Sequence, residues 1–84
     1  MSSKILKPIS LERSLSSANN VASAKLVRVL NPTASAVVLT IQYANTDAYA
    51  NCTINPNTDR LVEKSNGDLL LGTGLLGVSV AYTD

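Results

Sequence analysis

The last ten residues, 75–84, contain a strict alternation over residues 76–83 of larger apolar residues with small or polar ones. A period of two is typical of a β-strand with one buried face. We expect this strand to turn its larger side chains into the core. That inward set is Leu76, Val78, Val80 and Tyr82, and the outward set is Gly77, Ser79, Ala81 and Thr83.

Earlier segments repeat the alternation between turn-rich stretches. The expected strands span residues 24–31, 36–43, 48–55 and 60–64. A short loop containing Pro32 joins the first two, which predicts an antiparallel hairpin between them. The third would bury Ala50, Cys52 and Ile54, with Tyr49 on its opposite face.

The beginning of the chain and one leucine run are less regular. Residues 1–16 are expected to form an extended arm and a possible first strand, with Ile9, Leu11 and Leu15 on one face of that strand. Residues 69–71 are expected to form one helical turn or a short crossing. The sequence therefore predicts an all-β fold, a small antiparallel β-sandwich or barrel of about six to seven strands with an extended N-terminal arm. Its domains would be residues 1–16 for the arm and possible first strand, and residues 17–84 for the sandwich.

Composition points to a thin core. The chain has 84 residues, no Trp or Phe and only three Tyr, so Val, Leu, Ile and Ala must fill the interior. Small domains with modest cores often gain stability from disulfides, metals or oligomerisation. A single cysteine excludes an internal disulfide, and the absence of histidine argues against a structural zinc site. We therefore expect a homo-oligomer or a part of a larger assembly.

Charge and hydropathy narrow the set of partners. The formal net charge is only +1, and charged residues make up 15% of the chain, so no strong field attracts nucleic acid or an anionic membrane. No signal peptide and no apolar stretch long enough to span a bilayer are expected. The lone cysteine fits a reducing compartment. We expect neither nucleic acid nor membrane as a partner.

The sequence shows no catalytic, cofactor or metal site. General acid–base catalysis most often uses histidine, and there is none. Cys52 falls on a predicted buried face with no base to activate it. The alternation of Asn55, Asn57 and Asp59 is like half of a calcium loop, but Arg60 stands where that loop needs glycine. We expect no enzyme and no cofactor.

Contact with a protein partner is the remaining type of site. The side chains available for it lie in the arm, on the second apolar face of residues 24–31 and on one surface tyrosine. Tyr43 and Tyr82 fall on predicted core faces. Extended arms commonly brace a neighbouring subunit by strand addition or by lying in a groove. The partner-contact candidates are Lys4, Lys7, Ile9, Leu11, Arg13, Leu26, Leu30 and Tyr49.

Several features occur in the order found in a known group of proteins. They are the strand segments of residues 24–84, the Glu63-Lys64 pair after an apolar strand, an acidic turn at Asp68 and an Ala81-Tyr82-Thr83 ending. In these the chain resembles small all-β virion structural proteins of tailed bacteriophages, of the type found in cyanophages and other marine phages. The resemblance implies a virion location and other virion proteins as partners, either the major capsid protein or neck or tail subunits.

The resemblance implies a capsid decoration or cement protein that stabilises neighbouring capsid subunits. A small neck or tail component is the first alternative. A carbohydrate- or receptor-binding β-sandwich module is the second, and it would need an exposed aromatic platform. The sequence leaves these three functions open.

Overall fold

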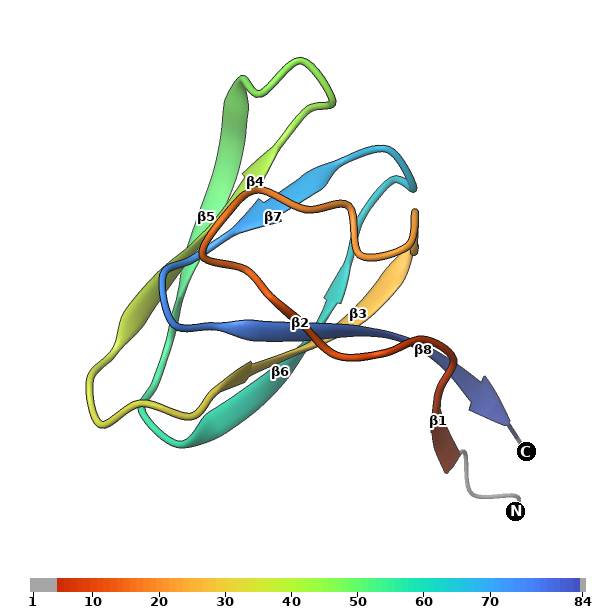
Figure 1. Ribbon diagram of the computed structural model, residues 1–84, viewed down its shortest axis with the longest axis horizontal. Coiled ribbons are helices and arrows are strands. Elements are labelled where there is room, and N and C mark those ends of the chain that lie inside the picture. Colours follow the sequence, from red (N-terminus) through yellow and green to blue (C-terminus); the bar gives the residue numbers. More distant parts are fainter. Residues whose placement is uncertain (1–4, 84) are drawn as a thin grey trace.

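The computed structural model describes residues 5–83 and is an all-β fold (Figure 1). The predicted class, a small antiparallel all-β sandwich or barrel, is confirmed, and the two sheets fit the sandwich alternative. Over residues 5–83 there are eight strands and no helix. The strands are β1 (Ile5–Pro8), β2 (Arg13–Ser14), β3 (Leu26–Asn31), β4 (Val37–Gln42), β5 (Ala48–Ile54), β6 (Thr58–Glu63), β7 (Leu69–Leu71) and β8 (Leu76–Thr83).

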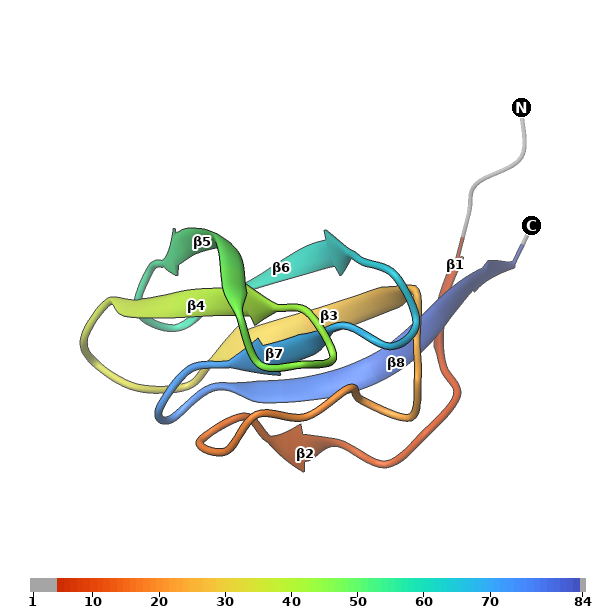
Figure 2. The same cartoon turned by 90° about the horizontal axis from the view of Figure 1, so that it is seen from above.

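The strands form two antiparallel sheets. The first sheet has the order β1-β8-β3-β6, with β2 also paired to β8, and the second has the order β5-β4-β7. The predicted hairpin of residues 24–31 with 36–43 is wrong, because β3 and β4 lie in different sheets and the loop between them crosses the sandwich. The helical turn or short crossing expected at residues 69–71 is also wrong: these residues form β7, which pairs with β4. In Figure 1 the strands β4, β5 and β7 lie mostly above β3, β6 and β8, and Figure 2 shows the same fold from above.

The core lies between the sheets and draws on both. It is built from the fully buried side chains of Leu15, Val21, Val27, Val29, Leu39, Ile54, Leu70 and Leu75. All are small or medium aliphatic residues, as the composition predicts. Each such side chain, fully buried, contributes roughly 1.5–3 kcal/mol relative to an exposed one.

The inward face of β8 differs from the prediction. Val27 pairs with Ser79 and Val29 with Gly77, and residues paired in this way share one side of a sheet. The core side of β8 therefore carries Gly77 and Ser79. A Cβ on Gly77 would come within 3.2 Å of the Leu15 side chain, so Leu15 occupies the space that a larger residue would need.

The predicted inward residues Val78 and Val80 are buried, but on the opposite side of the first sheet, outside the core cluster. The side chain of Tyr82 lies outside what the structure describes. We call this side, which also carries Leu26, Arg28 and Leu30 of β3, the outer face.

The N-terminal region is not the single strand expected over residues 9–15. β1 pairs with the end of β8, and the Ile9 amide still donates to the Ser79 carbonyl (2.9 Å). The chain then leaves the ladder, and the side chains of Ile9 and Leu11 are exposed. It returns at Leu15, whose amide donates to the Leu75 carbonyl (2.8 Å) and whose carbonyl accepts from Gly72 (2.8 Å). Two reciprocal backbone bonds then join Asn19 to Leu70 of β7. This segment thus bridges the two sheets along one edge.

A left-handed turn follows the bridge. Val21, Ala22 and Ser23 have φ values of 53°, 58° and 56°, a region that costs L-residues roughly 1–2 kcal/mol each. Burial of Val21 and a bond from its amide to Asn19 Oδ1 (2.7 Å) hold the turn. The sequence predicted a turn here, but not its left-handed backbone conformation.

Ala22→Gly is expected to raise the free energy of unfolding by about 0.5–1 kcal/mol, because glycine adopts positive φ without steric cost. Ala22 is exposed, so no packing is lost. Chemical denaturation measures the change. Ala36→Gly is the control: Ala36 is exposed, its φ is not positive, and glycine there should destabilise. Equal losses at both positions would contradict the strained turn.

Residues 5–83 contain no helix that could cross a membrane. The division at residues 16 and 17 into an arm and a sandwich stays a prediction.

Candidate functional site

Two exposed tyrosines stack at the turn end of the β4–β5 hairpin. The ring centroids of Tyr43 and Tyr49 are 4.3 Å apart with planes inclined by 27°. Tyr43 is 52% exposed and Tyr49 is 43% exposed. The prediction that Tyr43 belongs to the core is wrong, because β4 ends at Gln42, where a register shift breaks the alternation. The shift places both rings on the surface.

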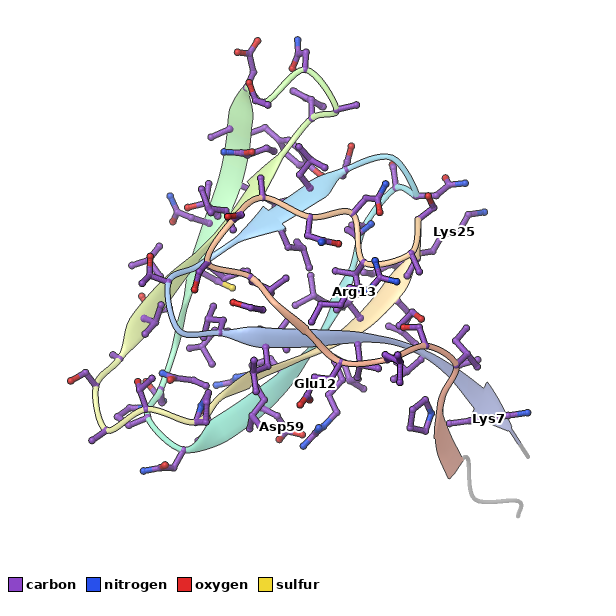
Figure 3. All side chains as sticks on the ribbon, viewed as in Figure 1. Lys7, Glu12, Arg13, Lys25 and Asp59 are labelled. Atoms are coloured by element: carbon purple, nitrogen blue, oxygen red, sulfur yellow. The ribbon has the colours of Figure 1, made fainter. Side chains whose placement is uncertain are left out.

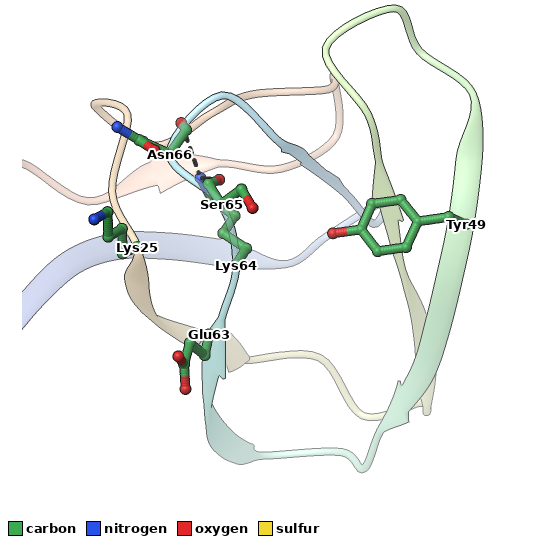
Figure 4. A pocket seen from close by; sticks show the side chains of 6 residues that line it. All are labelled: Lys25, Tyr49, Glu63, Lys64, Ser65 and Asn66. Carbon is green, nitrogen blue, oxygen red and sulfur yellow. Dashed lines mark hydrogen bonds between the residues drawn. The ribbon is translucent and has the colours of Figure 1, made fainter.

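An open hollow of about 680 Å³ lies beside Tyr49. Figure 4 shows Tyr49 reaching from β5 towards the end of β6 and the turn that follows. The hollow exists because β5 and β6, both edge strands, diverge after the turn that joins them. Its lining is mostly polar: Lys25, Tyr49, Glu63, Lys64, Ser65 and Asn66.

Asp68 fixes the phenol of Tyr49. The Tyr49 hydroxyl donates a hydrogen bond to Asp68 Oδ2. This bond, with smaller contributions from desolvation and from the charge of Asp68, raises the pKa of Tyr49 from 10.0 to about 12. The folded protein therefore holds this proton more tightly than the unfolded chain does. The stabilisation is present below pH 10 and is lost as the pH rises from 10 to about 12.

Asp68→Asn is expected to lower the pKa of Tyr49 from about 12 towards 10.0, since an amide carries no charge and accepts a weaker bond. A tyrosinate absorbance titration of the folded protein measures the shift. Asp47→Asn, a change of another acidic residue next to a turn, is the control and should leave the titration unchanged. An unchanged curve for Asp68→Asn would contradict the Tyr49–Asp68 contact.

Lys64 forms one wall of the hollow but is a structural residue. It is only 6% exposed, and its ammonium donates to the carbonyls of Ala24 (2.6 Å), Ser65 (3.3 Å) and Asn66 (3.4 Å). Burial lowers the pKa of Lys64, and the negative charge of Asp68 opposes that change. Lys64 thus links the residue before β3 to the turn after β6, and its ammonium group is already hydrogen-bonded to backbone carbonyls.

The predicted contact residues of the arm lie away from the tyrosines. Leu11 is 85% exposed and Ile9 is 58% exposed, whereas Arg13 is half-buried. Lys7 is exposed and points away from the sandwich, and Lys4 lies outside the described residues (Figure 3).

An ion-pair cluster brings the arm to the outer face of β3. Arg28 Nε lies 2.7 Å from Asp59, and Arg28 Nη1 lies 4.0 Å from Glu12 (Figure 3). Leu26 and Leu30 flank Arg28 on this face and are half-buried, less open than predicted. The structure therefore brings Glu12 of the arm to β3, while Tyr49 belongs to a separate surface.

Cys52 is exposed, so its predicted place in the core is wrong. It pairs with Leu39 and so points to the core side of the second sheet, but β5 is an edge strand and nothing covers that position. Within residues 5–83 no group of three or more His, Cys, Asp or Glu is arranged to hold a metal ion.

Sequence reasoning missed Tyr43 and Asp68 as parts of one surface. The bulge near Gln42 and the approach of the β6–β7 turn to the hairpin are long-range features with no local signal. The three comparisons with known proteins add no further signal: no family model matches the chain, and neither a curated protein nor a solved structure matches it significantly.

Proposed function

We propose that the protein is a non-enzymatic structural component of a tailed-phage virion, acting as a capsid decoration protein that docks on neighbouring capsid subunits. The observation that carries the docking part is the exposure of Leu11 (85%) and Ile9 (58%) on the segment between β1 and β2. The resemblance of residues 24–84 to phage virion proteins supports the virion part.

Burial of these side chains would supply binding energy. The apolar side chains of Ile9 and Leu11 are exposed, so they are free to enter a pocket of a partner. Fully burying an Ile or Leu side chain contributes roughly 1.5–3 kcal/mol. The Arg28 cluster beside the segment, with Asp59 and Glu12, supplies the polar groups that commonly rim an interface.

The low charge of the chain fits this function. Only 15% of the residues are charged and the net charge is +1, so a flat contact with other protein would bury few unpaired charges. The thin aliphatic core also favours stabilisation by neighbours. We further propose that copies of the chain associate with one another within the assembly.

Binding to particles tests the docking surface. The double variant Ile9→Ser, Leu11→Ser is expected to bind at least about 100-fold more weakly than the natural chain, from the loss of two buried apolar side chains. Co-sedimentation with purified capsids that lack the protein measures this. Val38→Ser removes another exposed apolar side chain, 53% exposed on β4, and is the control. Equal binding by the double variant and the natural chain would overturn the proposed surface.

The stacked tyrosines favour a second function, recognition of a carbohydrate. Exposed aromatic rings beside polar groups are suited to sugars, whose apolar ring faces stack and whose hydroxyls need hydrogen-bond partners. Tyr43 and Tyr49 beside the polar hollow offer both. A glycan array probed with the natural chain and with Tyr49→Ala tests this. Signals that Tyr49→Ala abolishes would support it, and an array without signals would reject it.

A further inference from the structure

We infer that the free edge of β5 is a self-association surface, on which a second copy of this chain adds its own β5 antiparallel and extends the β5-β4-β7 sheet across a two-fold axis. The inference deepens the self-association part of the proposed function and rests on that part alone. It assigns a strand and a partner, neither of which the virion proposal specifies.

A comparison of the four sheet edges carries the argument. Edge strands present unpaired N–H and C=O groups to which another strand can bind, and proteins commonly block them with charges, proline or a covering segment. The first sheet ends in β6, which carries Asp59, Arg60 and Glu63, and in β1, which carries Lys7 and Pro8. Both of these edges have such a block.

The second sheet differs between its two edges. On the β7 side, Asn19 forms bonds of 3.1 Å and 2.9 Å with Leu70 and occupies the edge. The β5 side has no covering segment within the described chain, and all of β5 except Ile54 is exposed. Residues 48–54 contain no charged residue, no proline and no glycine. Of the edges described, this one alone lacks a block.

The chemistry of β5 selects a copy of itself as the partner. Like charges placed opposite each other destabilise a strand pair, and β5 has none to oppose. In an antiparallel pair centred on Asn51, Tyr49 would lie opposite Thr53, a favourable aromatic–β-branched combination. The two Asn51 amides would face each other and can exchange hydrogen bonds. A two-fold pair of this kind closes as a dimer and leaves no free β5 edge.

Cys52 makes the pairing measurable. It is exposed on β5 and is the only cysteine of the chain, so no other thiol competes. In a pair centred on Asn51 or on Cys52, the two Cys52 side chains would share one side of the sheet with Cβ atoms about 5–8 Å apart. A short bifunctional maleimide spans that distance.

The experiment uses the full chain, purified and reduced, without any other virion protein. We expect a dimer by sedimentation that dissociates on dilution, and a covalent dimer after treatment with the cross-linker. The matched control is the double variant Cys52→Ser, Ser17→Cys. It moves the thiol to an exposed position near the Asn19 bridge, at the opposite edge of the second sheet. This control should remain uncross-linked while still forming dimers.

Placing a charge on the edge provides the second arm. Asn51→Lys puts two ammonium groups opposite each other and should yield a monomer, whereas Asn45→Lys makes the same change in the β4–β5 turn and should yield a dimer. Thermal unfolding shows whether both variants fold, and the cross-linking arm stands if Asn51→Lys does not. A natural chain that stays monomeric up to about 1 mM, where weak specific pairs associate, would overturn the inference. So would a dimer that Asn51→Lys does not weaken, or equal cross-linking through Ser17→Cys. None of these outcomes affects the docking of residues 9–11 on capsids.

Discussion

Leu15→Ala is expected to lower the free energy of unfolding by about 3 kcal/mol. Leu15 is fully buried in the core cluster, and its side chain fills the space above Gly77. Truncation leaves a cavity between the two sheets at the point where residues 15–19 connect them. The backbone of Leu15 is hydrogen-bonded to Gly72 and Leu75, so it can relax only partly into that cavity. Urea denaturation followed by circular dichroism measures the loss.

Leu11→Ala is the matched control, because it makes the same substitution four positions earlier on a side chain that is 85% exposed. Its effect on stability should be within about 0.5 kcal/mol of zero. The two variants together separate the part of the N-terminal region that holds the sandwich from the part that we assign to docking. Comparable losses at both positions would show that Leu11 packs in the folded state and would remove the basis of the docking surface.

Asn31→Leu is expected to be similarly severe, with a loss of about 3 kcal/mol, because it leaves buried backbone groups without partners. Asn31 is fully buried at the end of β3, where the chain leaves one sheet for the other. Its amide nitrogen donates to the carbonyls of Ser35 (2.8 Å) and Ile54 (3.0 Å), and its Oδ1 accepts from the amide and the hydroxyl of Thr33 (3.0 and 2.7 Å). One side chain thus joins β3, the crossing loop and the end of β5.

Asn45→Leu is the control, since Asn45 also caps a local turn through its Oδ1, at 3.1 Å from the Asp47 amide, but is exposed. Water replaces its bonds, so its loss should be below about 1 kcal/mol. Thermal or chemical unfolding of both variants gives the comparison. A small effect at Asn31 would mean that the crossing between the sheets does not depend on this side chain.

Local alternation was enough to locate the main strands and their turns. β3, β4, β5 and β8 lie where the period of two places them, because that period follows from the pleat of any strand. The partner of each strand could not be read in the same way. β3 and β4 are joined by a short loop, yet β3 pairs with β6 and β8, whereas β4 pairs with β5 and β7. The hydrogen bonds of the Asn31 side chain stabilise the crossing between the sheets.

The faces were harder to predict than the strands. Size suggested that Val78 and Val80 face the core, but both faces of β8 are covered, and the core side takes Gly77 because Leu15 needs the room. Cys52 points to the core side but is exposed, because it lies on an uncovered edge strand. The candidate surfaces depend on such long-range arrangements. Ile9, Leu11 and Tyr49 were predicted as contacts from the sequence, whereas the grouping of Tyr49 with Tyr43 and Asp68 required the structure.

The most direct test of the virion proposal is quantitative mass spectrometry of the purified phage particles to which the proposal assigns this chain. A decoration protein is expected in the particle at on the order of hundreds of copies, in a fixed ratio to the major capsid protein, because it follows the symmetry of the shell. About six or twelve copies would contradict decoration and indicate a neck or tail ring. Absence from the particle would contradict the proposed function as a whole.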